Sequence, residues 1–179
     1  MNSADPSRAP SAHGHTATAL LREQPIDPEL CTEIGRLAES AAARVAVDPA
    51  SGPDCVIAAV DAFVREMQQG GQSTLAGDSQ PEMALGALWG EQLVRGLGWL
   101  WTAVTFHGAD DITTVAVVSP DRALVIYPFH FIHGCLEHAA PVTILLAWEI
   151  LTHDGRVPSL PADSFENVMD HAHHPVPLR

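Results

Sequence analysis

The sequence predicts a single α+β domain, in which helices pack on a short, about three-stranded antiparallel meander and an N-terminal pair of helices precedes this unit. Three observations support this fold class. A chain of 179 residues with 46% hydrophobic content can bury one good core but hardly two. Apolar residues recur at helical spacing before residue 70 and again over 82–97. Between residues 99 and 127, β-branched and aromatic residues form three runs with turn-forming residues between them.

The two ends of the chain differ in composition from the part that we expect to fold. Residues 1–22 are rich in Ser, Ala, Pro, Gly and His without periodicity, and such a composition cannot offset the entropy lost on ordering. We therefore predict a disordered N-terminal tail. The predicted domain covers residues 23–174, with a helical pair over 27–70 and a helix–sheet–helix unit over 79–155, and residues 175–179 form a flexible C-terminus.

Two amphipathic helices are predicted at the start of the domain. Asp27 as N-cap and Pro28 as the first helical residue begin the first helix, which ends near Ala46. The second helix starts after Pro53, and Gly70 provides its stop. Because each helix carries a single apolar stripe, we expect the two to pack antiparallel against each other.

The central unit begins with a helix that contains two glycines. Ser79 and Glu82 have the spacing of a capping box, and Gly98 ends the helix. Gly86 and Gly90 lie four residues apart inside it, where each costs up to ~1 kcal/mol of helix propensity relative to alanine. We therefore predict that a strand or another helix approaches this helix closely at the two glycines.

Three strands follow, over residues 99–107, 112–118 and 123–127, with turn chemistry between them. In the first strand, Trp99 and Trp101 alternate with large apolar residues, so both faces of the sheet carry bulky side chains. We expect the two tryptophans to be buried under a further layer. An exposed tryptophan pair would instead indicate a binding face.

The chain is predicted to become helical again after Pro128, as far as His138. Pro141 then opens a helix that is apolar nearly all round and that Gly155 ends. In the proline-rich segment that follows, Asp163 with Glu166 three residues later predicts one short helix.

Three polar side chains fall together on one side of the predicted helix after Pro128, namely His130, His133 and Glu137. Two imidazoles and a carboxylate at this spacing could hold Fe(II) or Zn²⁺, which makes a metal-dependent enzyme one alternative function. The same spacing is that of the polar face of an amphipathic helix. We favour this second interpretation and expect neither a metal site nor another cofactor.

The charge of the chain is strongly negative. Nine arginines and no lysine face 22 acidic residues, which gives a formal charge of −13. Such a field repels nucleic acid and anionic membranes and attracts basic proteins. Five acidic residues on expected exposed faces or loops are the candidate contacts to such a partner: Glu29, Glu33, Asp110, Asp111 and Asp154.

The cysteines and the N-terminus bear on the compartment. Cys31, Cys55 and Cys135 are far apart in apolar helical patterns, which is typical of buried, reduced thiols. The sequence begins without a basic segment followed by an apolar one, and no apolar run approaches the ~20 residues that cross a bilayer. We expect a soluble, cytoplasmic protein.

Part of the central unit resembles a known kind of protein. The helix segment 85–91, the Gly98-Trp99 helix exit and the strand segment 118–128 are similar to those of small acidic bacterial α+β domains, over residues 82–151. The resemblance is to immunity proteins of secreted antibacterial toxins, and it implies no catalytic residue. It implies a non-enzymatic inhibitor that binds a basic toxin or effector directly. An adaptor or structural subunit is a further alternative, and a homodimer stays open.

Overall fold

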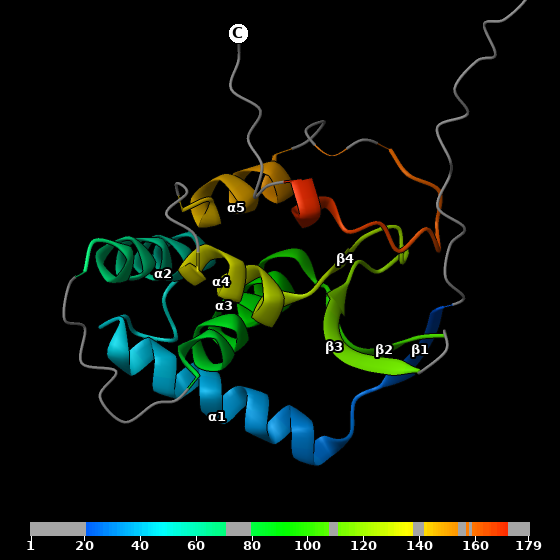
Figure 1. Ribbon diagram of the computed structural model, residues 1–179, viewed down its shortest axis with the longest axis horizontal. Coiled ribbons are helices and arrows are strands. Elements are labelled where there is room, and N and C mark those ends of the chain that lie inside the picture. Colours follow the sequence, from blue (N-terminus) through cyan, green and yellow to red (C-terminus); the bar gives the residue numbers. More distant parts are fainter. Residues whose placement is uncertain are drawn as a thin grey trace, which may run out of the picture.

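The computed structural model describes residues 21–70, 80–107, 111–137, 142–153, 157 and 159–171 (Figure 1). The elements follow in the order β1, α1, α2, α3, β2, β3, β4, α4, α5 and a final 3-10 helix, η1. The helices gather on one side of the view and the sheet on the other, with α3 between them. The predicted α+β class is confirmed. Within the described residues, no helix combines the length and the apolar character needed to span a membrane.

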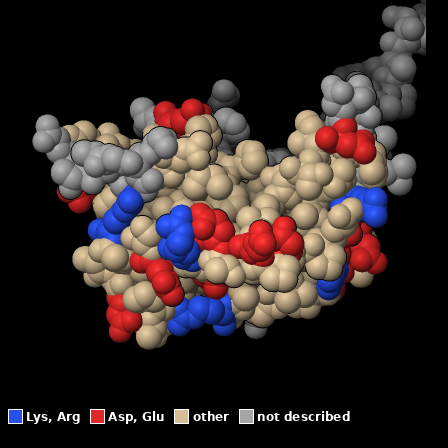
Figure 2. Space-filling model, turned by 90° about the horizontal axis from the view of Figure 1, so that it is seen from below, with Lys and Arg blue, Asp and Glu red and all other residues tan. Residues whose placement is uncertain are grey.

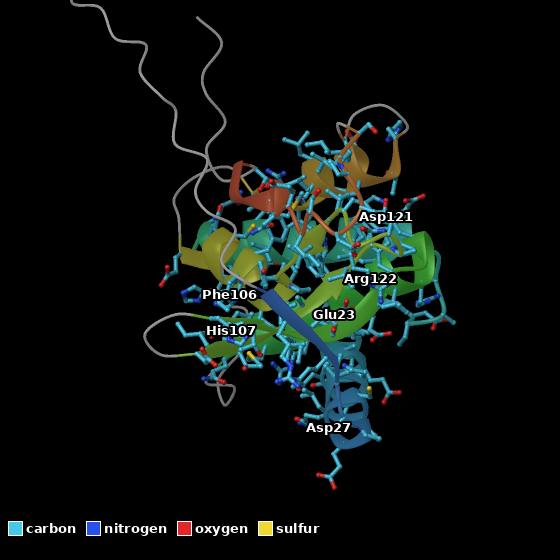
Figure 3. The ribbon with its side chains drawn as sticks, turned by 90° about the vertical axis from the view of Figure 1, so that its right-hand side faces the viewer. Glu23, Asp27, Phe106, His107, Asp121 and Arg122 are labelled. Atoms are coloured by element: carbon cyan, nitrogen blue, oxygen red, sulfur yellow. The ribbon has the colours of Figure 1, made fainter. Side chains whose placement is uncertain are left out.

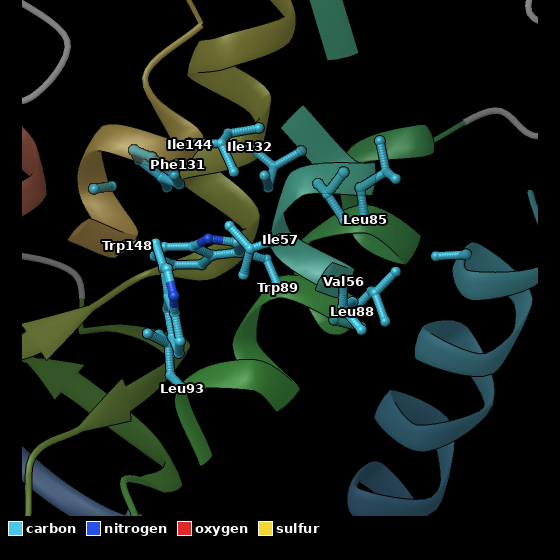
Figure 4. Packing of buried hydrophobic residues seen from close by; sticks show 14 of the residues in the cluster. Val56, Ile57, Leu85, Leu88, Trp89, Leu93, Phe131, Ile132, Ile144 and Trp148 are labelled. Carbon is cyan, nitrogen blue, oxygen red and sulfur yellow. The ribbon is translucent and has the colours of Figure 1, made fainter. Parts of the chain in front are cut away.

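Helix α3, Pro81–Leu97, lies at the centre of the helical part. Its buried residues point in every direction around the axis. The fully enclosed Trp89 packs on Phe131 of α4, Pro128–Glu137, with ring centroids 4.7 Å apart (Figure 4). Gly98 ends the helix in the left-handed conformation, with φ 68°. Gln80 is the N-cap and makes no side-chain capping bond, while Ser79 lies outside the described residues. The predicted capping box of Ser79 and Glu82 therefore lies partly outside the described residues.

The first two helices pack on α3 rather than on each other. Helix α1, Pro28–Arg44, contacts α3 along its length, and α2, Pro53–Gln68, contacts α3 and α5. The predicted antiparallel pair is wrong, because α3 is apolar all round and can cover both stripes at once. The predicted start of α1 is confirmed: Asp27 Oδ1 accepts a hydrogen bond from the Leu30 amide at 2.7 Å, and Pro28 follows at the first helical position.

The two glycines of α3 mark its closest contacts, as the sequence predicts. A Cβ placed on Gly86 would lie 2.9 Å from the Phe129 Cα of α4, Pro128–Glu137. A Cβ on Gly90 would meet the Trp101 ring and would lie 3.1 Å from the Pro128 ring. Trp101 is half-buried there, stacked on Phe129 at 5.8 Å, and its indole N–H donates to Glu91 Oε1 at 2.8 Å.

The sheet has four antiparallel strands in the order β1-β2-β3-β4. Their bounds are Leu21–Pro25, Leu100–Phe106, Ile112–Val118 and Val125–Ile126. The sequence analysis missed β1 and assigned its first two residues to the tail, because Arg-Glu-Gln has no apolar alternation. Its partners hold it instead: Thr102 Oγ1 donates to the Gln24 carbonyl at 2.8 Å, and Arg122 contacts Glu23 at 3.2 Å.

The sheet has a large core on one face and a small one on the other. Val115 and Val117 face the helices. Trp99, just before β2, is 6% exposed in the same large cluster, so the expected burial of this tryptophan is confirmed. On the second face, four small residues form a separate cluster against Phe106, Tyr127 and Phe165: Val104, Ala116, Val118 and Val125.

The C-terminal part departs from the prediction in two places. Helix α5, Ile144–Thr152, has Thr143 as its N-cap, and Pro141 lies outside the described residues. Asp163 caps no helix. It has φ 61°, and Glu166 pairs with Leu124 in a short parallel bridge before η1, Val168–His171. All three cysteines are free, but only Cys135 is buried; Cys31 and Cys55 lie exposed in the first turns of α1 and α2.

The close approach at Gly86 makes a stability prediction. Gly86→Ala should lower the free energy of unfolding by about 1–3 kcal/mol, because the added methyl group meets backbone of α4 that cannot rotate away. Gly35→Ala in α1 is the matched control, since nothing lies within 4 Å of its added Cβ. That variant should gain up to ~1 kcal/mol of helix propensity. Urea denaturation measures both, and equal shifts of the two variants would contradict the close packing.

Candidate functional site

An open groove lies over the second face of the sheet. Its volume is about 760 Å³, and it is bounded by the β2–β3 hairpin, α4 and the segment before η1. Aromatic side chains dominate its walls. The residues that line it are Phe106, Ile112, Thr113, Thr114, Tyr127, His130, Phe131, Phe165, Glu166, Asn167 and Met169.

The aromatic walls come from separate parts of the chain. Phe106, at the end of β2, and Tyr127, after β4, have ring centroids 6.0 Å apart, and Tyr127 meets the His130 ring edge-on at 6.3 Å. Phe131 connects the groove to the main core, because its other side packs on Trp89. The groove therefore has a rigid apolar wall on the side of α4.

Backbone hydrogen bonds hold the opposite wall. The Glu166 amide donates to the Ala123 carbonyl at 3.0 Å, and the Val125 amide donates to the Glu166 carbonyl at 3.1 Å. The Phe165 amide donates to the Arg122 carbonyl at 2.9 Å. The segment thus follows the outer edge of β4 and places the Phe165 ring against the small core.

The turn between β3 and β4 anchors this wall to β1. Ser119 Oγ donates to Asp121 Oδ1 at 2.7 Å, and the Ala123 amide donates to the same oxygen at 3.1 Å. These two donors hold the pKa of Asp121 below its ordinary value. Arg122, with φ 58°, donates to both carboxylate oxygens of Glu23, and Figure 3 shows the two side chains together beside β1.

One stretch of β3 beside the groove has no neighbouring strand on one side within the described residues. The whole of β3 pairs with β2, but β4 covers only Val117 and Val118 on the other side. Within the described part of the chain, no strand pairs with residues 112–116 on that side. Ile112, at the end of this edge, is 64% exposed and lines the groove.

The acidic residues that the sequence singled out do not gather at one place. Glu29 and Glu33 lie on α1. Figure 2 shows that acidic groups and arginines alternate over the face of the molecule that is seen there. Glu33 contacts Arg36 at 2.6 Å, and this hydrogen bond lowers the pKa of Glu33. Asp111 is exposed beside the groove and contacts His107 at 3.2 Å. Asp110 and Asp154 lie outside the described residues.

The three candidate metal ligands are divided between two places. His133 Nε2 contacts Glu137 Oε1 at 3.1 Å on the exposed side of α4, whereas His130 lies against Tyr127 on the groove wall. Among the described residues, no three His, Cys, Asp or Glu side chains are placed to hold one metal ion. The three predicted ligands His130, His133 and Glu137 are therefore not brought together around one point.

The groove itself escaped the sequence analysis. Phe106, Tyr127 and Phe165 belong to three different segments, and nothing in their spacing links them. The only local signal was the alternation in β2, which places Phe106 on the face away from the tryptophans.

Comparison with known proteins adds no family. No family model, curated protein or solved structure matches the chain. The function therefore has to be argued from the groove and the charges of this chain.

The turn at Ser119 generates a prediction on pH. Ser119→Ala should raise the pKa of Asp121 toward its ordinary value, since the largest cause of its lowering is lost. A lowered pKa means that the ionised carboxylate stabilises the fold above the unfolded-state pKa, and this contribution disappears as pH falls through the folded-state pKa. NMR titration of the Asp121 carboxyl carbon in both proteins measures the effect. An unchanged pKa would show that Ser119 does not donate to Asp121.

Proposed function

We propose that the protein is a non-enzymatic inhibitor of the immunity type, which binds a basic partner protein directly and inserts the partner's apolar side chains into the aromatic groove. The observation that supports this proposal is the groove itself: about 760 Å³, open, and lined by Phe106, Tyr127, Phe131 and Phe165. An open pocket of this size with half-buried and buried aromatic side chains in its walls is typical of binding sites.

The lining suits anchor residues of a protein. Buried aromatic and aliphatic anchors supply most of the energy in protein interfaces, and they need preformed apolar pockets. The Phe131 wall is preformed, because Trp89 supports it from inside. Polar groups on the rim, including Thr113 and Asn167, can exclude water around such an anchor.

The charges near the groove favour a basic partner. Glu166 is exposed and lines the groove, and Asp111 is exposed next to Ile112. The formal charge of −13 adds a long-range field of the same sign. Such a field raises the association rate with a cationic protein and disfavours nucleic acid.

Selection of peptides tests the groove as a binding site. A phage library of random 12-residue peptides is panned on the wild-type protein at low salt. We expect enriched peptides to combine aromatic or large aliphatic residues with arginine or lysine. Ile112→Asp should weaken their binding by about 10-fold or more, because it places a charge at the mouth of the groove. Enriched peptides that bind independently of Ile112, or no enrichment at all, would overturn the proposal.

The matched control for that variant is Leu146→Asp. Leu146 is 44% exposed on α5 and does not line the groove, so the same change of charge and polarity is made elsewhere on the surface. We expect its affinity for the peptides to stay within about 2-fold of wild type, because exposed positions outside an interface contribute little.

A second prediction concerns the rate of association with the selected peptides. Stopped-flow measurements should show the rate falling as salt rises from low to physiological concentration, where the Debye length is ~8 Å. At low salt, a variant with Asp111→Asn and Glu166→Gln should show a larger drop in association rate than a control variant with Glu29→Gln and Glu33→Gln. The control loses less because Arg36 already pairs with Glu33. An association rate that does not depend on salt would show that the negative charge serves solubility and not binding.

A further inference from the structure

Among the described residues no strand covers 112–116 of β3 on the β4 side, and this has a specific cause in the chain. Strand β4 pairs Val125 and Ile126 with Val118 and Val117, and two more residues in the same register would place Pro128 opposite Val115. Pro128 instead begins α4, and its ring packs near Gly90, so the chain turns away from the sheet. Strand β4 thus ends after two residues and does not pair with residues 112–116.

One hydrogen bond shows which residues of β3 direct their backbone N–H and C=O groups toward this edge. The Ser119 amide donates to the Leu124 carbonyl at 3.0 Å, so Ser119 directs its backbone groups toward the β4 side. Because consecutive residues of a strand direct these groups to alternate sides, Val117, Val115 and Thr113 do the same. Val117 pairs with β4, whereas among the described residues Thr113 and Val115 have no strand opposite them on that side.

The edge and the groove belong to one surface. Ile112, Thr113 and Thr114 line the groove from the edge itself. A strand added to this edge would lie ~4.8 Å from β3, and every second side chain would point to the face of the sheet that carries Phe106 and Phe165. Alternate side chains of such a strand therefore reach the aromatic walls.

We infer, on the basis of the proposed function, that the partner binds by adding an extended segment as a strand to residues 112–116 of β3. Backbone groups of the segment pair with those of Thr113 and Val115, and its alternate apolar side chains enter the groove. An arginine or lysine of the segment lies near Glu166 or Asp111. Edge-to-edge pairing with a second copy of this chain is disfavoured, because it brings together two molecules that each carry −13.

N-methylation of the selected peptides tests the strand pairing. An N-methyl group removes one backbone donor and leaves the side chain unchanged. Methylation at alternate positions of the peptide should weaken binding by about 10-fold or more, and methylation at the positions between should have a smaller effect, since only every second residue faces β3. Equal effects at all positions, or none, overturn the inference.

Amide hydrogen exchange of the full-length protein supplies a readout on β3. Binding of the peptide should slow hydrogen exchange of the Thr113 and Val115 amides. Exchange of the Thr114 amide should stay nearly unchanged, because the backbone groups of Thr114 are directed toward β2. If the peptides require Ile112 but these amides do not change, the proposed function stands and strand addition is overturned. If no peptide requires Ile112, both fail.

Two further experimental outcomes would show that something other than a partner protein occupies the edge of β3. A dimer of the free protein in sedimentation equilibrium that Thr113→Pro dissociates would assign the edge to a second copy. Faster exchange of the Thr113 and Val115 amides after removal of residues 172–179 would assign it to the chain's own C-terminal segment. We expect a monomer and unchanged exchange, and either of the other results overturns the inference.

Discussion

The close approach of α3 to α4 and β2 at Gly86 and Gly90 is the constraint on which the rest of the structure depends. With no Cβ at these positions, the Phe129 backbone and the Trp101 ring lie directly against the α3 backbone. Helix α4 thereby meets the α3 backbone directly at Gly86, and a single side chain, Trp101, lies between α3 and the sheet at Gly90. The cost in helix propensity, about 1 kcal/mol for each glycine, is offset by the dispersion contacts of the aromatic stack.

The same contact determines where the sheet ends. Since Pro128 packs near Gly90, the chain must leave β4 at that point and cannot extend the ladder along β3. In the described part of the chain, the second face of the sheet has a small core of four residues, against which Phe106, Tyr127 and Phe165 pack. Packing that stabilises one face of the sheet thus creates the open groove on the other, and the candidate binding site lies on the less enclosed side.

Local signals in the sequence predicted local structure well and the arrangement of elements less well. Asp27-Pro28 marked the start of α1 and Gly86 and Gly90 marked the close contact, because caps and glycines act within a few residues. The antiparallel helix pair failed, since an apolar stripe does not say which neighbour covers it. Strand β1 is held by β2 and Arg122 rather than by its own pattern, and the groove combines segments that only tertiary folding brings together.

In the proposed function, the charges attract a partner at long range, and short-range groups select it; the sequence analysis assigned both roles to the acidic residues. Nine arginines can neutralise at most nine of the 22 carboxylates, so the excess of 13 remains however the ion pairs form. Several arginines are fixed in structural pairs, with Asp61 on α2, Glu33 on α1 and Glu23 on β1. The remaining field acts at long range and on any cation, and therefore cannot by itself select a partner. Selection has to come from short-range groups, and in the described structure the aromatic groove beside the free edge of β3 provides them: backbone pairing would fix the register of a bound segment, and the alternate pockets would then discriminate between side chains.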